Sequence, residues 1–131
     1  MQELYNLEID DDTLLTMLEM NPEIKELTSN EVLNKINLLK IINCSNRQIT
    51  NIISSNSIYL SRMDDDIKKL ISYLLSVGFK SLNILFDSNP YILNLDEFEV
   101  KNYINKRVVS GESLSDIVDD LDTNPYLFLE M

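Results

Sequence analysis

Histidine and tryptophan are absent from this chain of 131 residues, and cysteine occurs only once, at Cys44. Without an imidazole, the catalytic triads and zinc sites that depend on histidine are excluded. A single cysteine can form neither an internal disulfide nor a thiolate cage for a metal, and no histidine is present to activate its thiol. We therefore predict a non-catalytic protein with no metal and no cofactor, in a reducing cytoplasm.

Glycine and proline are also scarce, with two and three copies, which leaves little material for hairpin turns and favours helices joined by short polar connections. Apolar residues make up 44% of the chain and are spread along its length, so we expect a folded domain. The longest apolar runs are too short to cross a bilayer, and the first residues, MQELYNLEIDDD, lack the pattern of a secretory signal. These features predict one all-α domain over residues 1–131 that does not enter a membrane.

Charge is unevenly distributed, although the formal net charge is −11. Residues 1–31 hold nine acidic residues and one basic residue, residues 32–62 hold four basic residues and no acidic one, and residues 63–131 hold thirteen acidic and six basic residues. This asymmetry indicates two faces or ends with different partners, or a basic segment that neighbours acidic ones in the fold. A solvated acidic surface that keeps the protein soluble is the plainer interpretation.

The strongest pattern is a repeat with a period of 33–35 residues, anchored on Asn21, Asn56, Asn89 and Asn124. Apolar residues stand seven before each anchor (Leu14, Ile49, Leu82, Ile117), three before it (Leu18, Ile53, Phe86, Leu121) and three after it (Ile24, Tyr59, Ile92, Leu127). Because offsets of −7 and −3 lie on one helical face, a short amphipathic helix is predicted ahead of each anchor.

Three anchors are followed by Pro, and this pair has a mechanical meaning. Asn is favoured at a helix N-cap and Pro at the first helical position, so each anchor should end one helix and start a short one. Longer helices are predicted over residues 32–42, 67–77 and 98–109, with capping boxes at 28–31, 45–48, 96–99 and 113–116. Such units bury their apolar stripes only by stacking, which predicts a short right-handed solenoid of about three and a half repeats.

Two segments, LLSVGFKSLNILFDSNPYIL (residues 74–93) and RVVSGESLSDIVDDLDTNPYLF (residues 107–128), carry a more specific pattern of Gly, apolar helix and Pro. They resemble the repeats of the mitochondrial transcription termination factor (mTERF) family, with Gly78 and Gly111 at the turn between the two helices. In the preceding copy, Asn43 or Cys44 takes the place of the glycine. The resemblance implies a helical scaffold that binds nucleic acid along a basic concave surface, which a net charge of −11 opposes.

Acidic clusters at residues 10–12 and 64–66 lack the ligand spacing of a calcium loop. Each precedes an apolar helix, where acids stabilise the positive end of the helix dipole, so we interpret them as caps. Glu112, Asp116 and the acids at 119 and 120 are likewise interpreted as a solvated helix face rather than a catalytic pair. Cys44 is interpreted as a small apolar turn residue.

Our first functional hypothesis is a non-catalytic helical-repeat protein that binds a protein with a basic surface. Its acidic surface would be Asp119, Asp120 and Asp122, with Tyr126 and Phe128 as exposed apolar anchors. A protein of this kind could act as an inhibitor or nucleic-acid mimic of phage or mobile-element origin. The alternative is an mTERF-like nucleic-acid-binding protein that contacts phosphates through the cations of the 32–62 segment, which are Lys35, Lys40, Arg47 and Arg62.

Overall fold

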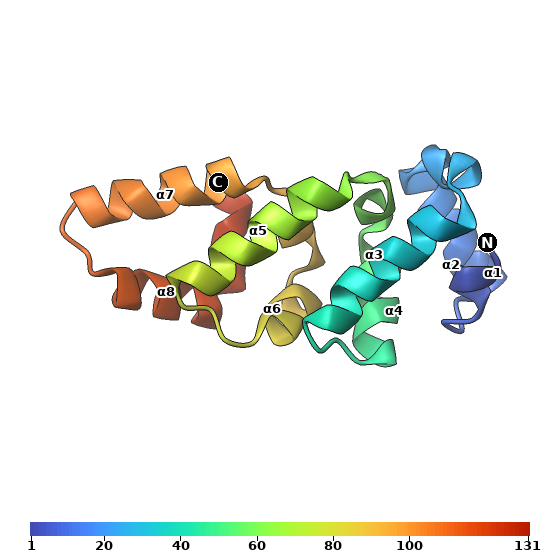
Figure 1. Ribbon diagram of the computed structural model, residues 1–131, viewed down its shortest axis with the longest axis horizontal. Coiled ribbons are helices and arrows are strands. Elements are labelled where there is room, and N and C mark those ends of the chain that lie inside the picture. Colours follow the sequence, from blue (N-terminus) through green and yellow to red (C-terminus); the bar gives the residue numbers. More distant parts are fainter.

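The computed structural model describes residues 1–131 and contains only α-helices and 3₁₀ helices, which confirms the predicted all-α class (Figure 1). In chain order they are α1 Gln2–Tyr5, α2 Asp11–Met20, η1 Pro22–Glu26, α3 Ser29–Ile41, α4 Asn46–Ser55, η2 Ser57–Ser61, α5 Asp64–Val77, α6 Leu82–Ser88, η3 Pro90–Asn94, α7 Glu97–Val109, α8 Leu114–Thr123 and η4 Pro125–Glu130.

Each repeat is a long α-helix, a shorter α-helix and a 3₁₀ helix, as in α3–α4–η2, α5–α6–η3 and α7–α8–η4. Successive copies pack in register. The long helix α5 lies between α3 and α7, α4 lies between α2 and α6, and the 3₁₀ helices contact one another in a row (Figure 1). Because every copy contacts the next one along, the core runs the length of the molecule as in other repeat arrays. The right-handed sense of the stack stays a prediction.

Local capping signals set the helix boundaries. Complete capping boxes form at Thr28 with Glu31, Ser45 with Gln48 and Asp96 with Glu99, in which each side chain accepts from the backbone N–H of the other residue. The predicted box at Ser113 forms only its N-cap half, in which the Ser113 hydroxyl accepts from the Asp116 N–H at 3.1 Å. The cap interpretation is confirmed for Asp10, whose carboxylate accepts from the Thr13 N–H at 2.7 Å. The acids at 64–66 instead lie in the first turn of α5, where the N-cap is Met63 and no side chain makes a capping hydrogen bond.

The turn between the two α-helices of each repeat needs a left-handed residue. Gly78 and Gly111 have φ values of 117° and 108°, and in the second repeat this conformation is taken by Asn43, with φ 71°. Asn tolerates that conformation better than other residues with a β-carbon. Of the two candidates from the sequence, Asn43 therefore replaces glycine, and Cys44 is a buried core residue.

The repeat alignment correctly predicted the core. Leu82, Phe86, Ile117 and Leu121 are all at most 2% exposed and occupy equivalent positions ahead of their anchors. Together with Tyr59 they belong to one continuous cluster of buried apolar side chains. No single helix is long and apolar enough to cross a membrane, although α5 and α6 reach that length and composition when taken as one pair bent by 116°.

The anchor asparagines do more than end a helix. The Nδ2 of Asn21 donates to the Ser57 carbonyl, that of Asn56 to the Pro90 carbonyl and that of Asn89 to the Pro125 carbonyl, each at 3.0 Å. Each bond therefore ties one repeat to the 3₁₀ helix of the next. Only the Asn21 side chain also caps its own 3₁₀ helix, by accepting from Glu23 N–H at 3.2 Å. The other anchors, Asn56, Asn89 and Asn124, occupy the N-cap positions of η2, η3 and η4 as predicted, but their side chains make no capping hydrogen bond.

Candidate binding surfaces

Charge is segregated between the two helical layers of the stack. The long-helix layer (α3, α5, α7) carries seven of the 11 lysines and arginines, together with six acidic residues. The short-helix layer (α2, α4, α6, α8) carries eight acidic residues and a single cation, Arg47. The negative net charge therefore resides mainly outside the long-helix layer.

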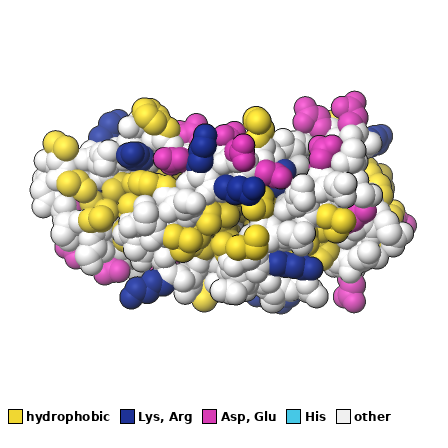
Figure 2. Space-filling view, in the orientation of Figure 1, with side chains coloured by type: hydrophobic (Ala, Val, Ile, Leu, Met, Phe, Trp, Pro, Cys, Tyr) yellow, Lys and Arg dark blue, Asp and Glu magenta, His cyan; other side chains and the backbone are white.

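Within the long helices, charge is ordered along the helix axis. Every acidic residue of α3, α5 and α7 lies in the first turn, and every lysine or arginine lies beyond it. The helix dipole favours acids at the N-terminus and cations toward the C-terminus, which explains the order. The three helices run side by side in the same direction, so their acidic first turns form a border along one edge of the layer. Figure 2 shows acidic side chains gathered mostly along the upper edge of this face, with basic side chains across and below it.

Two of the seven cations of the long-helix layer are occupied by the fold. The Lys35 ammonium is buried and paired with the Asp64 carboxylate of α5, and the Lys35 carbonyl accepts from the Tyr59 hydroxyl at 2.6 Å. Arg107 holds the Glu112 and Asp120 carboxylates at 2.6 and 2.9 Å.

The five remaining cations of the layer are exposed lysines that take part in none of the ion pairs of the molecule. They are Lys40, Lys68, Lys69, Lys101 and Lys106.

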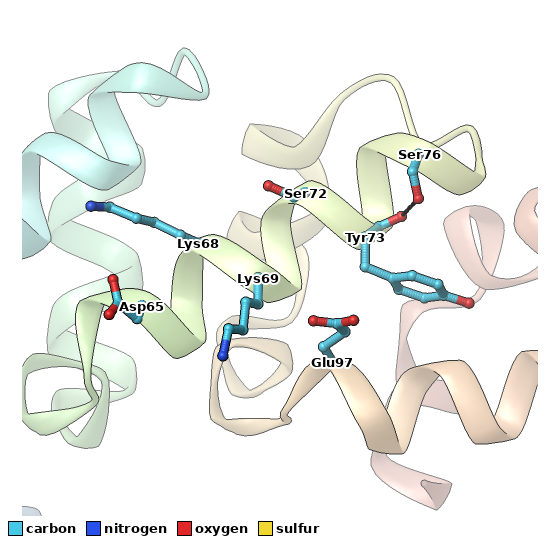
Figure 3. A pocket seen from close by; sticks show the side chains of 7 residues that line it. All are labelled: Asp65, Lys68, Lys69, Ser72, Tyr73, Ser76 and Glu97. Carbon is cyan, nitrogen blue, oxygen red and sulfur yellow. Dashed lines mark hydrogen bonds between the residues drawn. The ribbon is translucent and has the colours of Figure 1, made fainter.

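Lys68 and Lys69 lie on the exposed side of α5, here called its crest, and between them they line three surface hollows. The largest, of about 490 Å³, lies between α5 and α7, and its lining residues are Asp65, Lys68, Lys69, Ser72, Tyr73, Ser76 and Glu97 (Figure 3). Lys68 also lines the hollow between α3 and α5, and Lys69 lines the one beside Phe98. In Figure 3 the two ammonium groups extend from α5 in different directions, so each is free to reach a ligand on its own side.

Tyr73 and Glu97 line the same hollow on the side away from Lys68 (Figure 3). Tyr73 is half-buried, its ring lies beside the Glu97 side chain (Figure 3), and its carbonyl accepts from the Ser76 hydroxyl at 2.6 Å. Partial burial, and next the negative charge of Glu97, raise the pKa of the Tyr73 hydroxyl. The hydroxyl therefore remains a neutral donor and the ring an uncharged flat surface at neutral pH.

The structure places the four cations of the 32–62 segment in different settings. Lys35 is 4% exposed and bound to Asp64. Arg62 donates through Nη1 to two backbone carbonyls of the next repeat, at 2.6 and 2.7 Å, and Arg47 pairs with Asp87 of α6 at 3.1 Å. Only Lys40 is both exposed and unpaired. Three of the four cations therefore link neighbouring repeats, which is the role of intramolecular charge and hydrogen-bond partner.

Only some of the residues proposed for an acidic protein-binding surface are exposed and unpaired. Asp119, Asp122 and Tyr126 are exposed as expected. Asp120 is bound by Arg107, whose hydrogen bond lowers the pKa of the Asp120 carboxyl. Phe128 is 0% exposed.

The expectation that Phe128 is an exposed anchor is therefore wrong. Its ring packs against Phe79, with the ring centroids 6.1 Å apart, and so closes the core of the last repeat. In the two preceding 3₁₀ helices the residues three and four after the anchor are both buried, so Phe128, four after Asn124, belongs to the core, and the repeat alignment used only the first of these two positions.

Cys44 lies in an environment that disfavours the thiolate form of its side chain. It is buried behind α3 and α4, and burial raises the pKa of its thiol to about 11, with a smaller contribution from the charge of Asp87. The thiol is therefore protonated at neutral pH, in agreement with its interpretation as an apolar turn residue.

Comparison with known proteins bears on the whole stack rather than on one site. No curated protein and no solved structure matches the chain. The model of the mTERF family matches residues 1–120, which include all three long helices, three of the four anchors and both turn glycines. The match covers far more than half of the sequence. The chain therefore belongs to the mTERF family.

Proposed function

We propose that this protein is a non-catalytic nucleic-acid-binding protein that contacts its ligand through the long-helix layer. The observation that carries the proposal is the set of five exposed, unpaired lysines, all on α3, α5 and α7, in a chain of the mTERF family. Lysines that form no ion pair within the protein are available to replace the counterions of a phosphate backbone.

The position of the acids supports this use of the layer. Acidic residues of the long helices are confined to the first turns, which leaves the remainder of each helix free of negative charge. The acids of the short-helix layer belong to the other row of helices. An anionic chain that crosses α5 beyond its first turn meets Lys68 and Lys69, with Asp65 and Glu97 beside them.

The decisive experiment compares two variants with the same change in net charge. Lys68→Gln/Lys69→Gln removes the cations at the crest of α5, whereas Lys25→Gln/Lys80→Gln removes two exposed, unpaired lysines outside the long-helix layer. Fluorescence anisotropy with labelled DNA and RNA, at about 50 mM salt, should show affinity about tenfold weaker for the first variant only. Equal loss in both variants, or no binding by the unmodified protein, would contradict the proposal.

A second candidate function is the binding of a basic protein surface by the short-helix layer. The observation in its favour is the eight acids against one cation in that layer, with Asp119, Asp122 and Tyr126 exposed near the end of the stack. An acidic patch speeds encounter with a basic partner and loses that effect as salt screens it. Asp119→Asn/Asp122→Asn should then slow association with a partner captured from the host, while the Lys68/Lys69 variant should not.

A further inference from the structure

We propose that the ligand of the long-helix layer is single-stranded nucleic acid, with one unpaired base stacked on Tyr73 and the adjoining phosphates on Lys68 and Lys69. This inference rests on the proposed function. It assigns to the hollow between α5 and α7 a base-binding role in addition to phosphate contact.

The first argument is the charge of the hollow itself. Lys68 and Lys69 are opposed by Asp65 and Glu97, so the lining is electrically balanced, and Asp66 and Asp96 line the next hollow along. Attraction for phosphates is the main source of affinity for a ligand that offers only its backbone. Attraction for phosphates alone is therefore weak at this hollow, and a stacked base would add affinity that does not depend on charge.

The second argument is the position of the aromatic ring. Tyr73 follows Lys69 by four residues and therefore lies on the same face of α5, one turn further along. Its partial burial fixes the ring, so that little side-chain entropy is lost when a base packs against it. A cation followed by an aromatic platform is the arrangement by which proteins hold single strands, whose bases are free to stack.

The third argument concerns what a duplex would require. The bases of a duplex are stacked on one another and can be read only by an element that enters a groove. The helix α5 is flanked by α3 and α7 on its two sides, so it cannot project into a major groove (Figure 1). A duplex would contact this layer through phosphates alone.

The test uses the whole protein and three forms of one labelled oligonucleotide of mixed sequence: single-stranded, annealed to its complement, and single-stranded with its bases removed. Anisotropy titrations should show the intact strand bound at least about tenfold more tightly than the duplex. Tyr73→Leu should weaken binding of the intact strand by about 5- to 150-fold, the range found for one base–aromatic stack, and Tyr73→Phe should leave it unchanged. The abasic strand should bind the unmodified protein about 5- to 150-fold more weakly than the intact strand does, a comparison that does not depend on the folding of any variant.

The possible results distinguish a failure of the single-strand inference from a failure of nucleic-acid binding as a whole. Equal affinity for strand and duplex would overturn the inference while nucleic-acid binding stands. Unchanged affinity in Tyr73→Leu, or equal binding of the abasic strand, would also overturn it. Failure to bind any of the three oligonucleotides would overturn the proposed function as well.

Discussion

Replacement of Asn56 by Ala should reveal how much the anchor asparagines contribute to the stack. Asn56 is 0% exposed, and its Nδ2 donates to the Pro90 carbonyl at 3.0 Å and to the Asn94 Oδ1 at 2.9 Å. Its Oδ1 accepts from the Asn94 Nδ2 at 3.1 Å. Three hydrogen bonds between successive repeats therefore depend on one side chain.

The expected cost follows from what the substitution leaves behind. A neutral hydrogen bond contributes about 1 kcal/mol to stability, and a buried polar group left without a partner costs about 1–3 kcal/mol. Asn56→Ala removes three bonds and leaves the Pro90 carbonyl with no side-chain donor, in a site that is closed to water. We expect a loss of about 2–4 kcal/mol in the free energy of unfolding.

The chain supplies its own control for this measurement. Asn124 is the same residue type at the same repeat position, but its Nδ2 bonds only to Asp120 of its own helix at 2.9 Å, and it is half-buried. Asn124→Ala should therefore cost about 1 kcal/mol or less. Urea unfolding followed by circular dichroism gives both values from midpoint and slope. Equal losses in the two variants would refute the idea that these bonds hold neighbouring repeats together.

Three further predictions concern the core and its charges. Phe86→Ala should cost about 3–5 kcal/mol by leaving a cavity, measured as a lower melting temperature. Asp64→Asn, which leaves the buried Lys35 ammonium unpaired, should cost up to about 3 kcal/mol, whereas Lys35→Met/Asp64→Asn should recover most of it in urea titrations. The hydrogen bond from Arg107 lowers the pKa of the Glu112 carboxyl in the folded state. This hydrogen bond therefore stabilises the fold fully at pH values above the pKa that Glu112 has in the unfolded chain, and its contribution is lost as the pH falls through the pKa of Glu112 in the folded protein. Arg107→Gln should accordingly show a shallower loss of stability between about pH 5 and 3.

The fold was predictable where its signals are local. Capping boxes, the turn at Gly78 and the apolar offsets around each anchor all lie within a few residues of the structure they specify. The bond from Asn56 to Pro90 spans 34 residues and exists only once two repeats are stacked, so a reading of Asn as an N-cap missed it.

The binding surface was harder to predict, for the same physical reason. Cations were grouped by their closeness in sequence, over residues 32–62, but stacking brings together residues at equivalent repeat positions. Lys68 and Lys101 each stand twelve residues after an anchor, and both are exposed on neighbouring long helices. An alignment of charges on the anchors would have found this pair. No sequence pattern would have shown that Lys35 is buried against Asp64, because that pairing depends on how α3 packs against α5.

A protein of net charge −11 that binds an anionic chain should have an unusual salt dependence, and the structure indicates its direction. Release of counterions by Lys68 and Lys69 makes binding weaker as salt rises, by about 0.7 in the logarithm of the affinity for each phosphate of a single strand and each tenfold rise in salt. The acids of the short-helix layer repel the same ligand at long range, and salt screens this repulsion once the Debye length falls to about 10 Å near 0.1 M. The two effects oppose each other, while stacking on Tyr73 is insensitive to both. A shallow salt dependence, less steep than two phosphate contacts alone would give, is therefore the expected behaviour, and a steep one would mean that lysines beyond the crest of α5 carry the binding.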